Sequence, residues 1–330
     1  MKLIIYSVRE AEKPYINAWA KKTGHEVEMV DKPLNAKTVK LAQGYDGVSI
    51  QQTAKLGDAK VYEELAAMGI KQLSTRTVGV DMINLDDCKA NDIVVTNVPV
   101  YSPRAIAEMG VTQAMYLLRR IADFRERMAH GDFRWSDDLI SNEIYNLTVG
   151  VIGLGNIGGA TAQIYKALGA RVLAYDPFYN VEYEPYVEYT DFETVVKSAD
   201  ILTLHTPLLP STENMIAAPQ FKMMKNNAYL INMARGGLVN TSDLIAALEN
   251  HEIAGAGLDT LADETTFFSK QVSPDKIPAD YKKLAAMPNV LITPHIAFLT
   301  QTSIRNMVEI SLNDVVTVVE GKHSRNEIRM

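Results

Sequence analysis

Residues 149–164 read VGVIGLGNIGGATAQI, a short apolar run followed by a glycine-rich turn and a helical pattern. Within this stretch, residues 153–158 match the spacing G-x-G-x-x-G. Gly153 permits a tight turn, Gly155 lets backbone approach a pyrophosphate, and Gly158 lets the helix pack on the strand. The helix N-terminus that follows favours anionic phosphates. The stretch therefore predicts a dinucleotide-binding strand–turn–helix unit.

Asp176 ends the next apolar run, RVLAYD, and stands 23 residues after Gly153. In dinucleotide-binding folds an acidic residue about 20 positions along hydrogen-bonds the ribose 2′-hydroxyl. A carboxylate there repels the 2′-phosphate of NADP, so the sequence favours NAD. The plain alternative is a glycine-rich turn without a ligand, with Asp176 a polar residue at a strand end.

Two series of alternating apolar runs and helical patterns surround this unit, which begins about 150 residues into the chain. The first series gives strands at 2–7, 26–30, 46–50, 71–75 and 93–97, with helices at 12–24, 35–44 and 59–69. After one long amphipathic helix at 103–130, the second series adds strands at 171–176, 200–207, 228–234, 253–259 and 289–295. Such alternation is typical of βαβ units in parallel sheets. We therefore expect two α/β domains, a final helix at 302–321 packed on the first, and a substrate cleft between them.

The composition argues against several classes of partner. The 40 acidic residues outnumber the 33 basic ones, and the formal net charge of −7 disfavours nucleic acid and anionic membranes. No apolar run approaches the length of about 18 residues that a membrane span requires, and no His/Cys cluster has metal-ligand spacing. The single cysteine, Cys88, and an N-terminal apolar run too short for a signal peptide fit a reducing compartment. We expect a cytoplasmic protein without a bound metal.

Three polar residues follow three different strands of the second series. Arg235 follows YLINMA, Glu264 follows IAGAGLDTLAD, and His295 follows NVLITP. Because the carboxyl ends of parallel strands share one sheet edge, these side chains can meet beside a nicotinamide. Hydride transfer to a carbonyl requires a proton donor, a substrate anchor and a group that keeps the donor charged, and His, Arg and Glu supply them. Taken singly, each could be an ordinary loop residue, and Asp263 competes with Glu264 for the carboxylate role.

Seven stretches spread along the chain carry a resemblance to a known family. They are TVGVD (77–81), NVPVYSPRAIAE (97–108), VGVIGLGNIG (149–158), LHTPL (204–208), NMARGGLV (232–239), AGAGLDTLADE (254–264) and VLITPHIAF (290–298). The chain resembles the D-isomer-specific 2-hydroxyacid dehydrogenases, in particular the D-lactate and D-2-hydroxyisocaproate dehydrogenases of lactic acid bacteria. The similarity covers almost the whole chain.

The resemblance implies two doubly wound parallel-sheet domains. A Rossmann NAD-binding domain at 101–298 would be inserted into a flavodoxin-like substrate domain made of 1–100 and 299–330. It also implies a homodimer built through the NAD-binding domain. The implied activity is NADH-dependent reduction of a small 2-oxo acid to the D-2-hydroxy acid.

Family roles fall on matching positions of this sequence. The resemblance makes His295 the acid, Glu264 its partner and Arg235 the anchor for the 2-oxo acid. It implies substrate contacts from Tyr101, Val78, Gly79 and Phe298, although Tyr101 could instead pack at the domain hinge. The implied cofactor residues are Gly153, Gly155, Asn156, Ile157, Gly158, Asp176, Thr206, Pro207, Thr212, Met233, Ala234 and Asp259.

Two questions about function stay open at this point. The wider family includes NAD-sensing transcriptional corepressors that can retain the same His, Glu and Arg side chains. The excess of acidic over basic residues favours an enzyme over such a binding protein. The second question concerns substrate size. Ile50 precedes the paired Gln51 and Gln52, and Leu299 follows HIAF, where many lactate-selective relatives carry Tyr. A roomier pocket would accept branched or aromatic 2-oxo acids; the alternative is a strictly pyruvate-selective D-lactate dehydrogenase.

Overall fold

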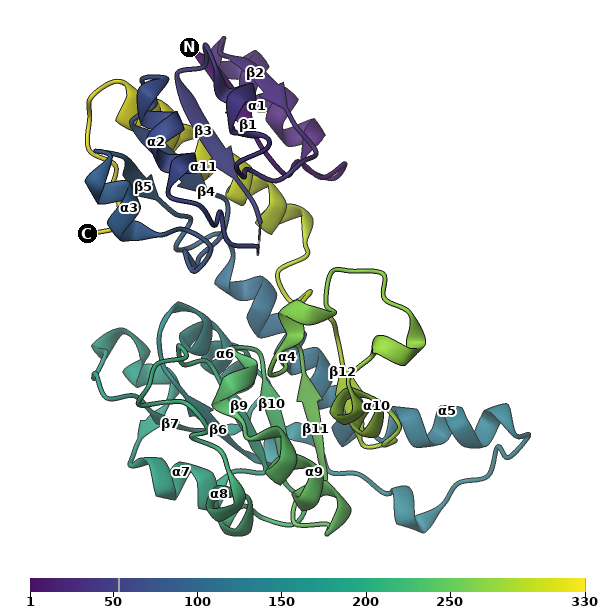
Figure 1. The fold of residues 1–330 in the computed structure, drawn as a ribbon. Helices are drawn as coiled ribbons and strands as arrows, with labels where there is room; N and C mark the ends of the chain where they lie inside the picture. Colours follow the sequence, from purple (N-terminus) through teal and green to yellow (C-terminus); the bar gives the residue numbers. More distant parts are fainter. Residues whose placement is uncertain (53, 330) are drawn as a thin grey trace. The chain divides into compact units, whose positions relative to one another are not determined.

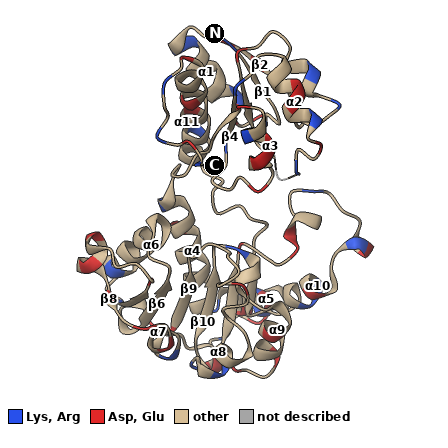
Figure 2. Ribbon diagram, turned by 60° about the vertical axis from the view of Figure 1, so that its left-hand side comes forward, with Lys and Arg blue, Asp and Glu red and all other residues tan. Residues whose placement is uncertain are grey.

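The computed structural model describes residues 1–52 and 54–329; Thr53 and Met330 lie outside the described part of the chain. The chain divides into two compact units (Figure 1). The first unit consists of Met1–Ser102 and Leu299–Met330, and the second of Pro103–Phe298. Lys and Arg are interspersed with Asp and Glu on the helices of both units (Figure 2).

The described residues of the first unit form a five-stranded parallel sheet in the order β2-β1-β3-β4-β5. The strands are β1 (Lys2–Ile5), β2 (Glu26–Met29), β3 (Gly47–Ile50), β4 (Gln72–Thr75) and β5 (Val94–Thr96). The helices are α1 (Lys13–Thr23), α2 (Lys60–Ala67), α3 (Leu85–Ala90) and α11 (Gln301–Val319). The order 2-1-3-4-5 is that of flavodoxin-like sheets.

Side chains that alternate along the strands of this sheet enter two separate apolar clusters. Leu3 and Ile5 of β1 join Trp19 of α1 and Leu312 of α11 in one cluster. The alternate residues of the sheet join helix α2 in the other. A Cβ on Gly47 would lie 2.4 Å from the Val315 side chain, so α11 lies directly against β3. Helix α11, although distant in sequence, is therefore part of this core.

The second unit contains, among its described residues, a seven-stranded parallel sheet in the order β12-β11-β10-β9-β6-β7-β8. Its strands are β6 (Thr148–Ile152), β7 (Arg171–Tyr175), β8 (Glu188–Tyr189), β9 (Ile201–Leu204), β10 (Tyr229–Asn232), β11 (Gly255–Leu258) and β12 (Val290–Ile292). Its helices are α4 (Pro103–Leu118), α5 (Ile121–Ala129), α6 (Asn156–Ala167), α7 (Phe192–Ser198), α8 (Ala218–Met223), α9 (Thr241–Glu249) and α10 (Ala279–Ala285). Counted from β6, the order reads 3-2-1-4-5-6, the Rossmann arrangement, with β12 added at the edge. The predicted class of two parallel α/β domains is thus confirmed.

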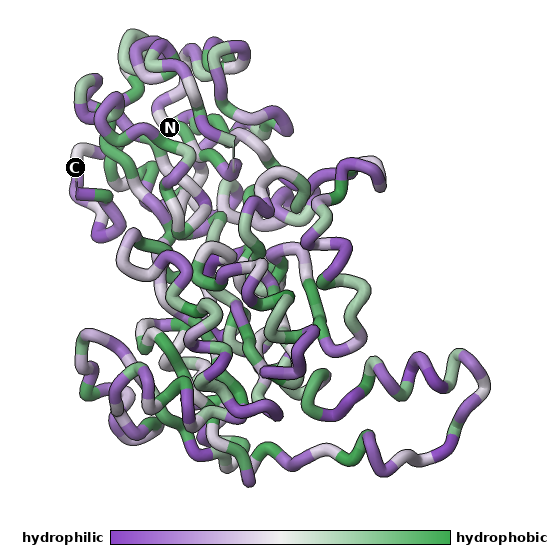
Figure 3. The backbone as a smooth tube through the Cα atoms, turned by 60° about the horizontal axis from the view of Figure 1, so that its bottom comes forward, coloured by the Kyte–Doolittle hydropathy of each residue, from purple (hydrophilic) through white to green (hydrophobic). Residues whose placement is uncertain are grey.

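Helices cover both faces of this sheet. Leu230, Ala256 and Leu258 belong to the apolar cluster that includes the buried side chains of α7, α8, α9 and α10. The alternate residues point the other way: a Cβ on Gly257 would meet Gln113 of α4. The apolar stretches follow the strands inside each unit, while the loops are largely hydrophilic (Figure 3).

Two helix predictions were wrong, for different local reasons. The stretch 35–44 forms only a 3₁₀ turn, Val39–Ala42. There the Asn35 side chain accepts the Lys37 N–H, and the Thr38 hydroxyl accepts the Asn35 N–H, in competition with helical bonds.

The predicted single helix at 103–130 is two helices, α4 and α5. Between them Arg120 takes φ +52°, a left-handed conformation that ends a helix, and its guanidinium pairs with Asp123. Throughout the described chain, no helix is long and apolar enough to span a bilayer.

Candidate active site

The glycine-rich turn joins β6 to α6, and its glycines meet different steric demands. Gly153 adopts φ +88°, and a Cβ there would lie 2.8 Å from the His205 backbone. A Cβ on Gly158 would lie 1.9 Å from the Gly153 carbonyl oxygen, so α6 begins in contact with the turn. No described atom lies within 4 Å of a Cβ built on Gly155, which leaves that backbone open to a ligand. The turn fits a pyrophosphate at the N-terminus of the 12-residue α6.

Asp176, at the carboxyl end of β7, holds this turn from the neighbouring strand. Its Oδ2 accepts a 2.6 Å hydrogen bond from the Leu154 N–H, and its Oδ1 accepts one of 2.8 Å from the Phe178 N–H. A carboxylate can accept about four hydrogen bonds, so acceptor positions remain for ribose hydroxyls. Sequence reasoning missed the contact with Leu154, because it joins two strands that only the sheet brings together.

The segment after β9 lines the other side of the turn. The Nε2 atom of His205 lies 2.9 Å from Oγ1 of Thr203, whereas its Nδ1 is buried and has no hydrogen-bond partner among the described residues. Burial lowers the pKa of His205 to about 3, so the ring is neutral at pH 7. Further along, the Thr212 hydroxyl donates a 2.7 Å hydrogen bond to the Pro207 carbonyl and closes this loop. The remaining sequence-predicted cofactor residues lie at the same sheet edge: Asn156 and Ile157 begin α6, Thr206 follows β9, Met233 and Ala234 follow β10, and Asp259 follows β11.

His295 and Glu264, from the ends of two neighbouring strands, form a direct pair. Nδ1 of His295 lies 2.5 Å from Oε1 of Glu264. The second carboxylate oxygen of Glu264 accepts a 2.8 Å hydrogen bond from the Leu261 N–H, which fixes the carboxylate. The His295 side chain is 39% exposed and that of Glu264 16%, so the pair faces solvent on the imidazole side. Asp263 is exposed and takes φ +56°, and Glu264 is the acid that meets the histidine.

The backbone of His295 is held in a conformation unusual for its residue type. Its φ is +55°, which costs an L-residue roughly 1–2 kcal/mol. The His295 N–H donates to the carbonyl oxygens of Asp259 at 2.9 Å and Thr293 at 3.0 Å. The Asp259 side chain, 1% exposed, accepts the N–H groups of Ile296 and Ala297, each at 2.9 Å. Asp259, which sequence reasoning placed beside the cofactor, thus holds the loop that carries His295.

Arg235 follows β10 in a tight turn that packs on the Glu264 segment. A Cβ on Gly236 would lie 1.9 Å from the Leu261 carbonyl carbon, so only glycine permits this approach. Buried Asn232 shapes the turn: its amide donates to the Arg235 carbonyl at 2.9 Å, and its Oδ1 accepts the Ala234 N–H at 3.0 Å. The Arg235 side chain is exposed, and its Nη1 donates to the Ala234 carbonyl at 2.8 Å. Asn232 was not among the residues singled out from the sequence. Its signal was a polar residue at the end of an otherwise apolar strand.

The other sequence-predicted substrate residues lie mostly in the first unit. Val78 and Gly79 follow β4, where the Asn97 amide donates to the Val78 carbonyl at 2.6 Å and the Thr77 hydroxyl to the Gly79 carbonyl at 2.6 Å. Phe298, partly buried, ends the second unit.

Three further residues of the first unit bear on the substrate prediction. The Tyr101 carbonyl accepts a 2.6 Å hydrogen bond from Asn306 of α11. Ile50 is fully buried in the core, so the expectation that it opens a substrate pocket was wrong. Leu299 is 50% exposed.

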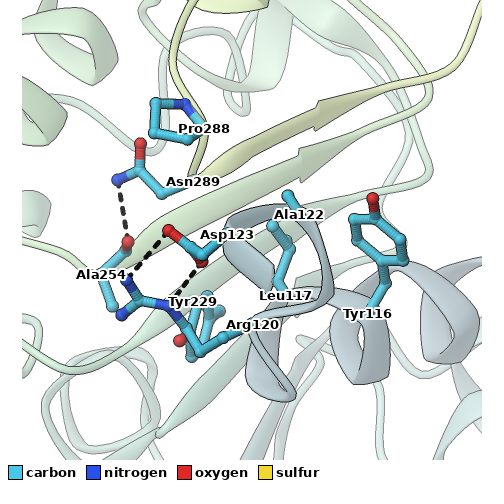
Figure 4. A pocket seen from close by; sticks show the side chains of 9 residues that line it. All are labelled: Tyr116, Leu117, Arg120, Ala122, Asp123, Tyr229, Ala254, Pro288 and Asn289. Atoms are coloured by element: carbon cyan, nitrogen blue, oxygen red, sulfur yellow. Dashed lines mark hydrogen bonds and ion pairs between the residues drawn. The ribbon is translucent and has the colours of Figure 1, made fainter. Parts of the chain in front are cut away.

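None of these residues lines the small pocket of the second unit that Figure 4 shows. Its lining includes Tyr229 at the amino end of β10, Ala254 just before β11 and Asn289 just before β12, with the Arg120–Asp123 ion pair beside them. The pocket is therefore at the sheet edge opposite His295. Its volume of about 10 Å³ suits one water molecule rather than an organic acid. Over residues 1–52 and 54–329, no group of three or more His, Cys, Asp or Glu residues has metal-site geometry.

Comparisons with known proteins assign the family. Residues 111–297 match the model of the D-isomer specific 2-hydroxyacid dehydrogenase, NAD binding domain. The chain is 41% identical to a D-2-hydroxyacid dehydrogenase (NAD(+)) of Clostridioides difficile, over 99% of this chain and 100% of that one. It is 42% identical to a D-lactate dehydrogenase of Lactiplantibacillus plantarum, over 100% and 99% of the two chains.

Solved structures agree with this assignment. The D-isomer specific 2-hydroxyacid dehydrogenase of Lactobacillus delbrueckii ssp. bulgaricus, in its NAD-complexed form, matches with a TM-score of 0.95 at 55% identity, over 99% of this chain and 100% of that chain. A D-2-hydroxyisocaproate dehydrogenase matches with a TM-score of 0.94 at 36% identity, over 99% of both chains. The family resemblance and the NAD cofactor inferred from the sequence are confirmed. The chain belongs to the D-isomer specific 2-hydroxyacid dehydrogenases, NAD-dependent oxidoreductases, and residues 111–297 form the family's NAD-binding domain.

Proposed function

We propose that this enzyme reduces a 2-oxo acid to the D-2-hydroxy acid with NADH. The observation that carries the proposal is the His295–Glu264 pair, 2.5 Å between Nδ1 and Oε1, at the strand ends of the NAD-binding domain. A carboxylate on Nδ1 stabilises the imidazolium and directs the other nitrogen, Nε2, towards the substrate carbonyl. His295 is the proton donor and Glu264 its partner.

Arg235 is the substrate anchor in this proposal. Its guanidinium is exposed on a turn that packs against the Leu261 backbone, three residues before Glu264. A guanidinium binds a carboxylate through two parallel hydrogen bonds and also polarises an adjacent carbonyl. Arg235 would therefore hold the 2-oxo acid while His295 protonates its keto oxygen.

The cofactor fits the cradle at the glycine-rich turn. The open backbone at Gly155 and the N-terminus of α6 suit the pyrophosphate, and Asp176 retains acceptor positions for the ribose. When bound, NADH supplies the hydride. We assign the remaining lining to Gly153, Asn156, Ile157, Gly158, Thr206, Pro207, Thr212, Met233, Ala234 and Asp259.

The first unit is the substrate domain in this proposal. Residues 1–100 and 299–330 form it, and the NAD-binding domain at 101–298 is inserted between them in the sequence. The backbone at Val78 and Gly79, fixed by Asn97 and Thr77, offers N–H groups to the substrate carboxylate. Tyr101, whose carbonyl is held by Asn306, and Phe298 complete the proposed substrate contacts.

In this proposal the enzyme reduces 2-oxo acids with branched or aromatic side chains at least as efficiently as pyruvate. Leu299 is 50% exposed where many lactate-selective relatives carry Tyr, and an aliphatic side chain leaves more apolar room. Since Ile50 lies in the core, this proposal rests on Leu299 alone. Each methylene that fits an apolar pocket contributes roughly 1–3 kcal/mol to discrimination.

The enzyme is a homodimer formed through its NAD-binding domain. Helix α5 and the following segment project from that unit (Figure 1), and no residue of α5 in the described structure is buried. The segment exposes Phe133 (74%), Trp135 (97%) and Ile140 (78%), and large exposed apolar side chains are typical of protein–protein interfaces. Light scattering should give twice the chain mass, and Trp135→Glu should shift the measured mass towards that of the monomer.

The proposed cellular location is the cytoplasm. The buried free thiol of Cys88 is in keeping with a cytoplasmic location.

The decisive test is loss of NADH absorbance with pyruvate, 2-oxoisocaproate and phenylpyruvate, followed by chiral analysis of the product. The proposal predicts turnover and the D-isomer, and His295→Gln should lower kcat by about 10²-fold or more while NADH still binds. NADH binding without turnover on any 2-oxo acid would instead indicate a corepressor-type NAD sensor.

A further inference from the structure

We propose that Gln113 and Thr293 are positioning residues that hold the His295 loop through the carboxylate of Asp259. The inference rests on the proposed role of His295 as proton donor. The Gln113 amide Nε2 on α4 donates a 2.8 Å hydrogen bond to the Thr293 hydroxyl. That hydroxyl donates in turn to Asp259 Oδ1 at 2.5 Å. A helix on one face of the sheet is thereby tied to the loop at its edge.

The direction of these hydrogen bonds is fixed by chemistry. An ionised carboxylate only accepts, so the Thr293 hydroxyl must donate to Asp259 and must accept from Gln113. The Gln113 Oε1 atom is buried and has no hydrogen-bond partner in the part of the chain that the structure describes. A buried acceptor without a partner is uncommon and calls for an explanation. The explanation we infer is that the hydrogen bond from Nε2 to Thr293 fixes the orientation of the amide and leaves Oε1 facing Gly257.

Gly257 of β11 makes room for this amide. A Cβ at Gly257 would lie 2.7 Å from Gln113 Oε1 and 3.1 Å from Gln113 Cβ. Gln113 is 1% exposed, beneath the carboxyl end of the sheet. The sequence therefore combines a glycine on the strand with a polar residue on the helix. An apolar pair at these two positions would leave no buried polar atom without a partner.

The relay ends on the backbone next to His295. Asp259 accepts the N–H groups of Ile296 and Ala297 through its side chain and that of His295 through its carbonyl. Three consecutive N–H groups thus depend on one residue. Since His295 sits at φ +55°, a loosened carboxylate lets this residue relax and moves Nδ1 away from Glu264. Displacement of a catalytic group by about 1 Å can slow a reaction about 10²-fold.

A purely stabilising role is the competing explanation, and the chain offers a matched control. The Asn289 amide donates a 2.9 Å hydrogen bond to the Ala254 carbonyl, which ties the amino ends of β11 and β12. The Thr293–Asp259 bond ties the carboxyl ends of the same two strands. Asn289→Ala removes a side-chain hydrogen bond between these strands without touching the His295 loop.

The experiment compares Thr293→Val, Thr293→Ser and Asn289→Ala with the parent enzyme. For each we would measure the unfolding temperature, the NADH dissociation constant by fluorescence, and kcat well below unfolding. Thr293→Val should lower kcat at least about tenfold and leave the NADH dissociation constant within about twofold. Thr293→Ser, which keeps the hydroxyl, should restore most of kcat. Asn289→Ala should lower the unfolding temperature and keep kcat.

Gln113→Met provides a second variant of similar shape should Thr293→Val fold poorly. It should lower kcat in the same direction, and the double variant should be no slower than Thr293→Val alone, because both act through one relay. Full kcat in Thr293→Val, or a loss of kcat in Asn289→Ala that matches it, overturns the inference. Failure of the proposed function gives a different result: the parent enzyme would bind NADH and turn over no 2-oxo acid, whatever the Thr293 variants show. A His295→Gln enzyme with full kcat would remove His295 from the role of proton donor.

Discussion

Glu264 places its Oε1 2.5 Å from Nδ1 of His295, and its other oxygen is fixed by the Leu261 N–H at 2.8 Å. The backbone therefore holds the carboxylate in place independently of the histidine. A preorganised acceptor of this kind stabilises positive charge on the imidazole without rearrangement during the reaction.

The first prediction concerns the partner of His295. Glu264→Gln keeps the size of the side chain and removes the negative charge that lies 2.5 Å from Nδ1 of His295. Because that charge stabilises positive charge on the imidazole, kcat for the 2-oxo acid should fall by about 10²-fold while NADH binding stays near normal. Initial rates of NADH oxidation and a fluorescence titration with NADH measure the two. Unchanged kcat in Glu264→Gln would remove Glu264 from the assigned role.

The second prediction concerns the substrate anchor. Arg235→Lys keeps the positive charge and loses the planar fork that grips a carboxylate. It should lower kcat/KM for the 2-oxo acid by about 10²-fold and leave NADH binding near normal. Lys225→Arg is the control: it exchanges the same two residue types near the amino end of β10, away from the candidate site, and should keep full activity. Retention of activity by Arg235→Lys would exclude the bidentate anchor.

The third prediction concerns cofactor choice. The Asp176 carboxylate repels a 2′-phosphate, so NADH should be used with much higher kcat/KM than NADPH. Asp176→Ala should narrow this gap. Because Asp176 also accepts the Leu154 N–H at 2.6 Å, the variant should bind NADH more weakly as well. Comparable kcat/KM for the two cofactors in the parent enzyme would contradict the assignment.

The fourth prediction concerns substrate size. With Leu299 in place of a tyrosine, 2-oxoisocaproate or phenylpyruvate should be reduced at least as efficiently as pyruvate. Leu299→Tyr should shift the ratio of kcat/KM values towards pyruvate. A preference for pyruvate of about 10²-fold in the parent enzyme would show that other side chains close the pocket.

The fifth prediction concerns stability and His205. Burial lowers its pKa to about 3 in the folded protein, below its ordinary value of 6.5, so the unfolded chain binds the extra proton between these values. The free energy of unfolding should therefore decrease as pH falls below 6.5, by about 2 kcal/mol between pH 7 and pH 5 from this residue. His205→Gln removes that contribution. Urea unfolding at both pH values measures it, and equal pH dependence in the two proteins would show that His205 is not buried as a neutral ring.

The local pattern of the sequence was sufficient for most of the strands and helices and for the choice of many candidate site residues. The spacing of Gly153, Gly155 and Gly158 after an apolar run predicted a strand–turn–helix unit, and the structure has β6 and α6 there. Residues at strand ends, such as His295 and Glu264, were predictable because parallel strands place their carboxyl ends at one edge.

Tertiary structure decided what depends on residues distant in sequence. It selected Glu264 rather than Asp263 as the partner of His295, since the turn after β11 presents one side chain and leaves the other in solvent. It buried Ile50 and broke the helix at Arg120. It also joined Gln113 to Thr293 across 180 residues. Periodicity and spacing report the neighbours of a residue along the chain, whereas hydrogen bonds of this kind depend on which helix packs over which strand.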